Sequence, residues 1–158
     1  MAEPLVIPDV SALRSFVGKK LGTSDWLEMT QERIDRFAEA TGDAQWIHVD
    51  PERAERESPF GTTIAHGYLT LSLAPYLFRQ IVEVKGTRMT VNPGVEHMRL
   101  RAPVRRGDRV RLHATLKDVR DIPGGAVRVT LTLQFEIEGQ RRPAANGDAA
   151  LVYYPELP

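Results

Sequence analysis

The chain has 158 residues, of which 42% are hydrophobic and 27% are charged, which is enough for one globular domain with a buried core. Lysine and arginine total 21, as do aspartate and glutamate, so the net charge is zero and a general electrostatic grip on nucleic acid is not expected. Cysteine is absent, which excludes disulfides, thiolate catalysis and cysteine-ligated metal sites within this chain.

The sequence shows no pattern that favours export or membrane insertion. Residues 1–5 lack the basic and then apolar order of a secretory signal. Residues 61–78 carry no charged side chain, but they include several hydroxyl groups, a histidine and a proline. A bilayer-spanning helix needs about 20 mostly apolar residues, so this stretch is expected to be a buried core element. We therefore expect a soluble, cytoplasmic protein with no membrane partner.

The first half of the chain carries helix signals. Thr30 is a good N-cap for a helix that ends at Gly42, with apolar residues at helical spacing between them. Asp50 and Pro51 predict the start of a second helix, as cap and first helical residue. Residues 67–82 are apolar on nearly every side, which is typical of a buried helix, and Pro75 is expected to kink it.

The second half of the chain carries strand signals. Residues 109–116 and 127–138 alternate between apolar and polar side chains, which is typical of antiparallel strands with one wet face. Residues 123–125 predict a hairpin turn, and residues 88–101 and 147–154 complete the set of strands. Helices followed by strands predict an α+β fold in which a bent antiparallel sheet wraps around a buried central helix.

A compact motif lies in the loop between the predicted helices. It consists of Gly42-Asp43, Ile47-His48 and Asp50, followed by Ala65-His66-Gly67 immediately before the apolar helix. These residues resemble the MaoC-like dehydratases, the (R)-specific enoyl-CoA hydratases of the hotdog fold, and in particular their NodN-like branch. The chain departs from the family pattern at Gln45-Trp46, where Asn-Pro is usual. The resemblance covers roughly residues 17–154, so residues 1–158 are expected to form a single hotdog domain with residues 1–16 as an N-terminal extension.

The resemblance implies a reaction, its catalytic residues and an assembly. The reaction is reversible hydration of a trans-2-enoyl-CoA to an (R)-3-hydroxyacyl-CoA. The motif match assigns the catalytic pair to Asp43 and His48, and the oxyanion donor to the backbone N–H of Gly67. A carboxylate and an imidazole that converge on one water suit this chemistry, because water attacks the β-carbon while the α-carbon gains a proton. Family members are typically homodimers, and no metal or redox cofactor is implied.

Further residues are weaker candidates for contact with the substrate: Gln45, Trp46, His66, Ser72, Arg99 and Arg101. His66 is more simply explained as a hydrogen-bonded support for the loop, and Ser72 as a buried hydroxyl bonded to backbone. The clustered basic residues that are candidates for the CoA phosphates are Lys85, Arg88, Arg99, Arg101, Arg105 and Arg106. A solvated strand face explains most of them equally well.

Three alternatives stay open at this point. A hotdog thioesterase would direct water at the thioester carbonyl and release free thiol. A non-catalytic acyl-CoA-binding module would keep the pocket without turnover. It stays open because of Gln45-Trp46 and because Pro75 stands where some family members carry a serine in the site. His48 and His66 with Asp43 or Asp50 offer ligand atoms for a metal, although no metal-binding spacing such as His-Glu-x-x-His is present.

Overall fold

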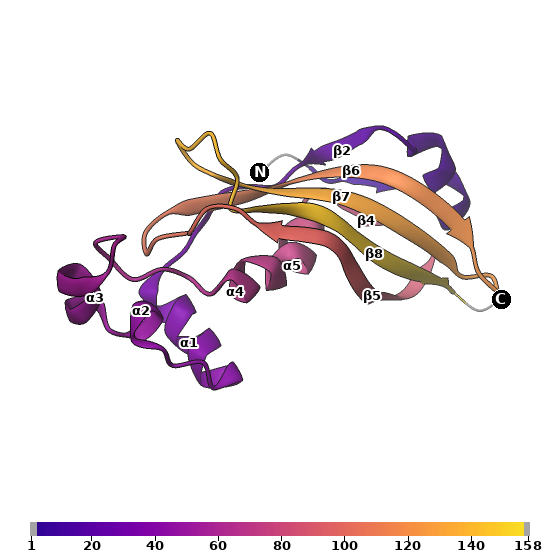
Figure 1. Ribbon diagram of the computed structural model, residues 1–158. Coiled ribbons are helices and arrows are strands. Elements are labelled where there is room, and N and C mark those ends of the chain that lie inside the picture. Colours follow the sequence, from indigo (N-terminus) through magenta and orange to yellow (C-terminus); the bar gives the residue numbers. More distant parts are fainter. Residues whose placement is uncertain (1–2, 157–158) are drawn as a thin grey trace.

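The computed structural model describes residues 3–156, and Figure 1 shows a long, curved sheet that arches over two short helices. A second group of helices lies beyond one end of the sheet. The elements, in chain order, are β1 (Leu5–Ile7), the 3-10 helix η1 (Val10–Phe16), β2 (Lys20–Thr23), β3 (Leu27–Glu28), α1 (Gln31–Thr41), α2 (Trp46–Val49), α3 (Pro51–Glu57), α4 (Gly67–Ser72), α5 (Ala74–Phe78), β4 (Val82–Val84), β5 (Thr87–Leu100), β6 (Arg109–Asp121), β7 (Val127–Ile137) and β8 (Ala145–Pro155).

The main sheet is antiparallel and has the strand order β2-β6-β7-β8-β5, with β3 also paired to β6. Strands β6 and β7 alternate buried and more exposed residues, as their period-two sequence predicts. The hairpin between them falls at the predicted turn, because Gly124 and Gly125 both have positive φ. The sheet therefore has one apolar face and one polar face, and the α+β hotdog fold is confirmed.

Helices α4 and α5 cover the apolar face of the sheet (Figure 1). The predicted continuous helix over residues 67–82 is wrong in detail, since α4 ends at Ser72, α5 begins at Ala74, and β4 starts at Val82. Pro75 lies in the first turn of α5, where a proline needs no hydrogen-bond partner for its nitrogen, so the break precedes it. The helix pair is buried on one side only, because Tyr68 is 75% exposed and Tyr76 is 51% exposed.

The N-terminal residues close one end of the core. Strand β1 pairs in parallel with β4, and Asp9 caps η1 by accepting from the backbone N–H groups of Ser11 and Ala12. Ile7 and Leu13 are almost completely buried in the same apolar cluster as the sheet. Residues 3–16, which the sequence predicts to belong to an N-terminal extension, therefore pack as part of the domain.

Helices α1, α2 and α3 form an arm beyond the end of the sheet (Figure 1). The predicted caps are confirmed: Thr30 accepts from the N–H of Arg33, and Asp50 accepts from the N–H of Arg53. Gly42 ends α1 in the left-handed conformation, with φ of 78°, which glycine adopts without strain. The loop that carries the motif therefore starts with a sharp change of chain direction. None of the helices among residues 3–156 is long and apolar enough to cross a membrane.

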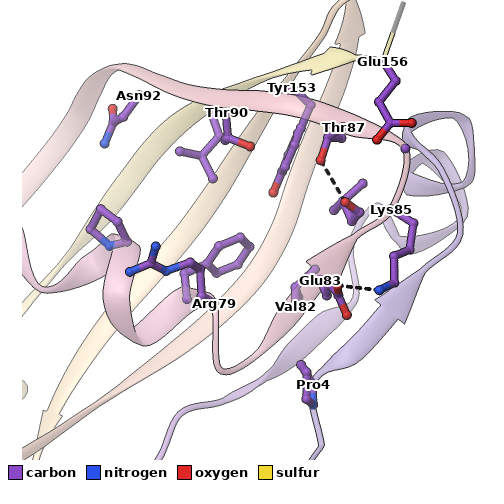
Figure 2. A pocket seen from close by; sticks show the side chains of 15 residues that line it. Pro4, Arg79, Val82, Glu83, Lys85, Thr87, Thr90, Asn92, Tyr153 and Glu156 are labelled. Carbon is purple, nitrogen blue, oxygen red and sulfur yellow. Dashed lines mark hydrogen bonds and ion pairs between the residues drawn. The ribbon is translucent and has the colours of Figure 1, made fainter.

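Strand β5 forms one edge of the main sheet and is exposed along almost its whole length. Apolar side chains lie on this strand and on the helices next to it, and those more than 40% exposed are Met89, Val91, Val95, Leu100, Tyr68 and Tyr76. A cavity of about 720 Å³ opens between α5, β4 and the strands β5 and β8 (Figure 2).

The polar face of the sheet carries a connected network around Glu136. Arg111 donates to both carboxylate oxygens of Glu136, at 2.7 and 3.2 Å, and His113 bridges Glu136 to Thr23. The guanidinium of Arg111 also lies over the ring of Trp26, 4.3 Å from its centroid. These contacts join β2, β6 and β7. The hydrogen bonds from Arg111, with a smaller effect from His113, hold the pKa of Glu136 below its usual value.

We predict that Glu136→Gln lowers the free energy of unfolding by about 1 kcal/mol at pH 7. A depressed carboxyl pKa stabilises the fold above the unfolded-state pKa, and this stability is lost as pH falls through the folded-state pKa. The difference between wild type and variant should therefore shrink on acidification, measured by urea unfolding between pH 7 and pH 3. Glu138→Gln is the control, since its more exposed ion pair with Arg109 contributes less. Equal losses at every pH would contradict this account.

We predict a second stability effect where α4 meets β5. A Cβ at Gly67 would lie only 2.3 Å from a methyl carbon of Leu100, which is itself 55% exposed. Gly67→Ala should therefore cost about 1 kcal/mol, because Leu100 must move aside. In a Leu100→Ala background the same change should cost nothing, measured by a double-mutant cycle of thermal unfolding. An equal cost in both backgrounds would show that Leu100 is not the obstacle.

Candidate active site

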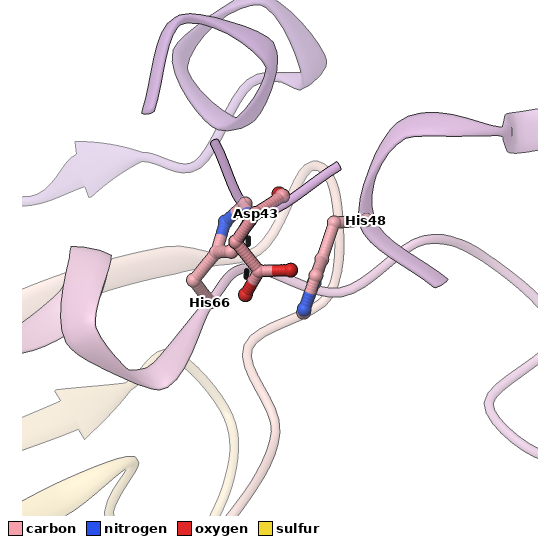
Figure 3. Close-up of side chains that lie close together, drawn as sticks. All are labelled: Asp43, His48 and His66. Carbon is pink, nitrogen blue, oxygen red and sulfur yellow. Dashed lines mark hydrogen bonds and ion pairs between the residues drawn. The ribbon is translucent and has the colours of Figure 1, made fainter. Parts of the chain in front are cut away.

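The motif residues Asp43, His48 and His66 lie together where the arm meets the start of α4 (Figure 3). Asp43 follows the left-handed Gly42, His48 lies in α2, and His66 immediately precedes α4. The three side chains offer ligand atoms that all lie within 4.8 Å of one another. The fold thus brings both residues of the predicted catalytic pair, and one of the weaker candidates, into one site.

His48 is buried, with 7% of its surface exposed, and its hydrogen bond fixes its tautomer. Its Nδ1 lies 2.6 Å from the backbone oxygen of Ile64. A carbonyl oxygen only accepts, so Nδ1 carries the proton and donates it. The lone pair of the neutral ring is therefore on Nε2, on the other side of the ring. This nitrogen is available as a base toward Asp43.

His66 holds the Asp43 loop by its main chain. Its Nε2–H donates to the backbone oxygen of Asp43 at 2.8 Å, and the same nitrogen lies 3.9 Å from the Asp43 carboxylate. The ring is 3% exposed and stacks on His48, with centroids 3.8 Å apart and planes 24° from parallel. Phe37 packs on it with a centroid distance of 5.0 Å. Of the two roles considered for His66, contact with the substrate and support of the loop, this geometry favours support of the loop.

The side chain of Gln31 forms a polar strut, a pair of hydrogen bonds that joins α1 to His48 and to Thr63. The side chain of Gln31, at the start of α1, donates to the backbone oxygen of His48 at 2.7 Å and accepts from the hydroxyl of Thr63. Thr63 is completely buried, and the backbone N–H of Ile64 donates to Ile47 in α2. Nothing in a sequence motif signals this strut, because its partners lie 17 and 32 residues from Gln31 along the chain.

The Asp43 carboxylate is the open member of the site, with its side chain 55% exposed. Substrate and water therefore have access to it, while both imidazoles are covered by protein. Its only hydrogen bond among residues 3–156 is a long one, 3.5 Å, from the N–H of Gln45. The carboxylate is thus free to hold a water together with Nε2 of His48.

The same three residues are also close enough to be tested as a metal site. Metal ligation needs nitrogen lone pairs that point at one position, whereas stacked imidazoles direct theirs side by side. The His66 nitrogen that lies nearest to the Asp43 carboxylate already donates its proton to the Asp43 carbonyl. A cation would have to replace that hydrogen bond, so the donor set fits acid–base chemistry better than metal binding.

Gly67 places a free backbone donor beside the site. It directly follows His66 as the first residue of α4, and no acceptor for its N–H is found in the described part of the chain. Because α4 has only six residues, the dipole contribution is small, and the N–H itself is the relevant group. The close contact with Leu100 shows that the glycine also serves tight packing.

The other candidates lie outside this cluster of side chains. Trp46 stacks under the guanidinium of Arg53, 4.4 Å from the ring centroid, and so belongs to the packing of α2 on α3. The Ser72 hydroxyl is exposed, contrary to the expected burial, and donates to the backbone oxygen of Tyr68. Arg101 donates to Asn146 in β8 at 2.9 Å. Gln45 and Arg99 are exposed, and no contact of their side chains with the cluster is found in residues 3–156.

Comparison with known proteins identifies the family to which this chain is similar. The model of the MaoC-like domain matches residues 13–136. The chain is 46% identical over 144 residues to 3-hydroxyacyl-thioester dehydratase Z of Mycobacterium tuberculosis, covering 91% of this chain and 95% of that protein. It is 43% identical over 135 residues to nodulation protein N of Rhizobium leguminosarum, covering 85% and 84%.

A solved structure extends the similarity to the fold. The (R)-hydratase from A. caviae involved in PHA biosynthesis superposes with a TM-score of 0.70 at 28% identity, covering 88% of this chain and 96% of that one. The family match spans more than half of the chain, and the resemblance seen in the Gly-Asp, Ile-His and Ala-His-Gly motifs is confirmed. The chain belongs to the MaoC-like family of hotdog dehydratases and hydratases.

Proposed function

We propose that this protein hydrates trans-2-enoyl-CoA thioesters to (R)-3-hydroxyacyl-CoA thioesters, and catalyses the reverse dehydration. The observation that carries the proposal is the open Asp43 carboxylate close to His48, whose Nδ1 is held by the Ile64 carbonyl, with the free N–H of Gly67 directly after His66 in the same cluster. The relatives named as dehydratase and (R)-hydratase support this reaction class. The cytoplasmic location stays a prediction.

In this proposal Asp43 and His48 handle the protons. A water held between the carboxylate and Nε2 loses one proton to the pair as its oxygen bonds to the β-carbon of the substrate. The pair returns one proton to the α-carbon, so the catalyst is regenerated and one water is added in total. Burial of both imidazoles keeps the His48 ring in a single orientation during this exchange.

The Gly67 N–H stabilises the charge that develops on the thioester oxygen. Attack at the β-carbon moves electron density through the α-carbon to this oxygen, which becomes enolate-like. A single preorganised donor contributes about 3–4 kcal/mol in comparable sites. The absence of a side chain at position 67 lets the thioester approach this N–H closely.

We predict that Asp43→Asn and His48→Ala each lower kcat by at least about 100-fold. The measurement is the loss of enoyl-thioester absorbance with a short and a long trans-2-enoyl-CoA. Glu39→Gln, an exposed carboxylate four residues before Asp43, should retain wild-type activity and serves as the control. Release of free thiol would identify a thioesterase instead. Binding of substrate by folded protein without turnover would identify a non-catalytic module.

We also propose that two copies pair through β5. The strand has an unpaired edge, and apolar side chains on it and on α4–α5 remain exposed. Register shifts along β5 leave Gly94–Glu96 as a regular stretch near its middle. A free edge with an apolar border is aggregation-prone unless another chain covers it, and a second copy supplies a complementary edge. No nucleic-acid partner is proposed, and acyl-CoA is the expected small-molecule partner.

We predict that Val95→Glu converts a wild-type dimer into a monomer at micromolar concentration, measured by sedimentation equilibrium. The reason is that Val95 lies in the regular stretch of the free edge and is 52% exposed. Val17→Glu is the matched control, because Val17 is 44% exposed but lies outside the β5 edge, next to η1. A monomeric wild-type protein, or an unchanged mass for Val95→Glu, would contradict the proposed interface.

A further inference from the structure

The cavity between α5 and the sheet is lined mostly by apolar surface, and several hydrogen-bond donors without partners also lie on it (Figure 2). Its volume is about 720 Å³, which is in the range of a small-molecule site. Phe78, Val82 and Leu151 supply apolar surface. This lining suits an aliphatic chain. The cluster residues Asp43, His48 and His66 do not line it, so its role must be argued from its own groups.

Three polar side chains on this cavity, those of Tyr153, Thr90 and Asn92, keep a donor that has no partner in the described chain. Tyr153 has a ring that is 5% exposed, its hydroxyl points into the cavity in Figure 2, and no hydrogen bond to it is found within residues 3–156. Burial raises the pKa of Tyr153 to about 12, so its hydroxyl stays protonated and able to donate. The hydroxyl of Thr90 is likewise without a partner in the described chain. Asn92 uses its oxygen to accept from the N–H of Gly94, which leaves its NH₂ group free to donate.

The charges on the cavity are arranged unevenly. Lys85 is paired with Glu83, and Figure 2 shows this pair beside Val82, to one side of Arg79. Arg79 forms no ion pair with any residue between 3 and 156. Its guanidinium is a permanent cation with donors only. The Arg79 side therefore offers an anion a positive charge and hydrogen-bond donors together.

We propose that this cavity binds an aliphatic carboxylate, with the chain against Phe78 and Leu151 and the carboxylate on Arg79, Thr90 and Tyr153. A carboxylate is the simplest group that accepts from all of these donors and also compensates the unpaired guanidinium. A neutral alkyl end would give the buried hydroxyl of Tyr153 no acceptor, which disfavours binding.

The position of the cavity connects this ligand with the reaction, a step that rests on the proposed function. Strand β5 borders the cavity at its start, through Thr87 and Thr90, and touches Gly67 at its end, through Leu100. Pairing of two β5 edges about a two-fold axis perpendicular to the sheet is antiparallel. The start of one strand then lies beside the end of the other. Each cavity is thereby placed beside the Gly67 of the second copy, and the bound carboxylate becomes the far end of a substrate's acyl chain.

The binding test compares octanoate with 1-octanol, which share a chain but not a charge, by isothermal titration. We expect octanoate to bind about tenfold more tightly to the wild type and this preference to vanish in Arg79→Ala. Tyr153→Phe, which removes only the unpartnered hydroxyl, should weaken octanoate several-fold without lowering the melting temperature. Arg141→Ala, an exposed arginine outside the cavity lining, is the control and should bind like wild type. Equal binding of both probes, or equal effects of the two arginine variants, would overturn the carboxylate site.

The kinetic test compares trans-2-octenoyl-CoA with its counterpart that ends in a carboxylate. We expect kcat/KM of the wild type to favour the carboxylate substrate about tenfold, and Arg79→Ala to abolish this preference while turnover of crotonyl-CoA stays unchanged. Octanoate selectivity without this kinetic preference would keep the carboxylate site and overturn its assignment to the substrate. The titration needs no turnover, so an inactive protein that still prefers octanoate would contradict the proposed function and support the cavity assignment.

Discussion

Two hydrogen bonds from imidazole N–H groups to backbone carbonyls hold the site together. One runs from His48 to Ile64 and the other from His66 to Asp43, at 2.6 and 2.8 Å. Each satisfies a buried donor and at the same time decides which ring nitrogen carries the proton. Because the rings also stack on each other, neither can turn without displacing its neighbour. The rest of the site depends on this pair of fixed rings.

The aspartate illustrates how the arrangement works. In the proposed reaction the carboxylate must meet water and substrate, and the side chain of Asp43 is about half exposed. Its position is instead secured through its own backbone oxygen, by the buried His66, and by the sharp turn at Gly42 before it. The reactive group stays accessible while its main chain is held, which is the preorganisation that proton transfer requires.

Local signals allowed much of this molecule to be predicted from sequence. Period-two alternation located β6 and β7, capping chemistry located α1 and α3, and the motif identified Asp43 and His48. The contacts that hold the site could not be predicted from the sequence, because they join residues that are far apart in the chain. The His66 bond to the Asp43 carbonyl spans 23 residues, and the Gln31 strut spans 17 and 32. Strands β1 and β4 have three residues each, too few to show a period.

The apolar content of the chain led to one wrong prediction, the full burial of residues 67–82, and the error has a physical reason. Hydrophobicity on every side of residues 67–82 predicts full burial, yet Tyr68 and Tyr76 lie exposed beside the free edge of β5. A sequence does not distinguish apolar surface that its own chain covers from apolar surface left for another chain.

The exposed tyrosines, the unpaired edge and the open cavity all lie along β5 and the helices next to it, whereas Asp43, His48 and His66 lie where the arm meets the start of α4. In the proposed function, proton chemistry at Asp43 and the buried His48 is thus separated from the surface that is proposed to meet a second copy and the acyl chain. Strand β5 touches both regions, since Leu100 packs on Gly67 and Thr90 lines the cavity. A change of substrate can therefore arise along β5 and α5 while the Asp43–His48–His66 cluster stays as it is.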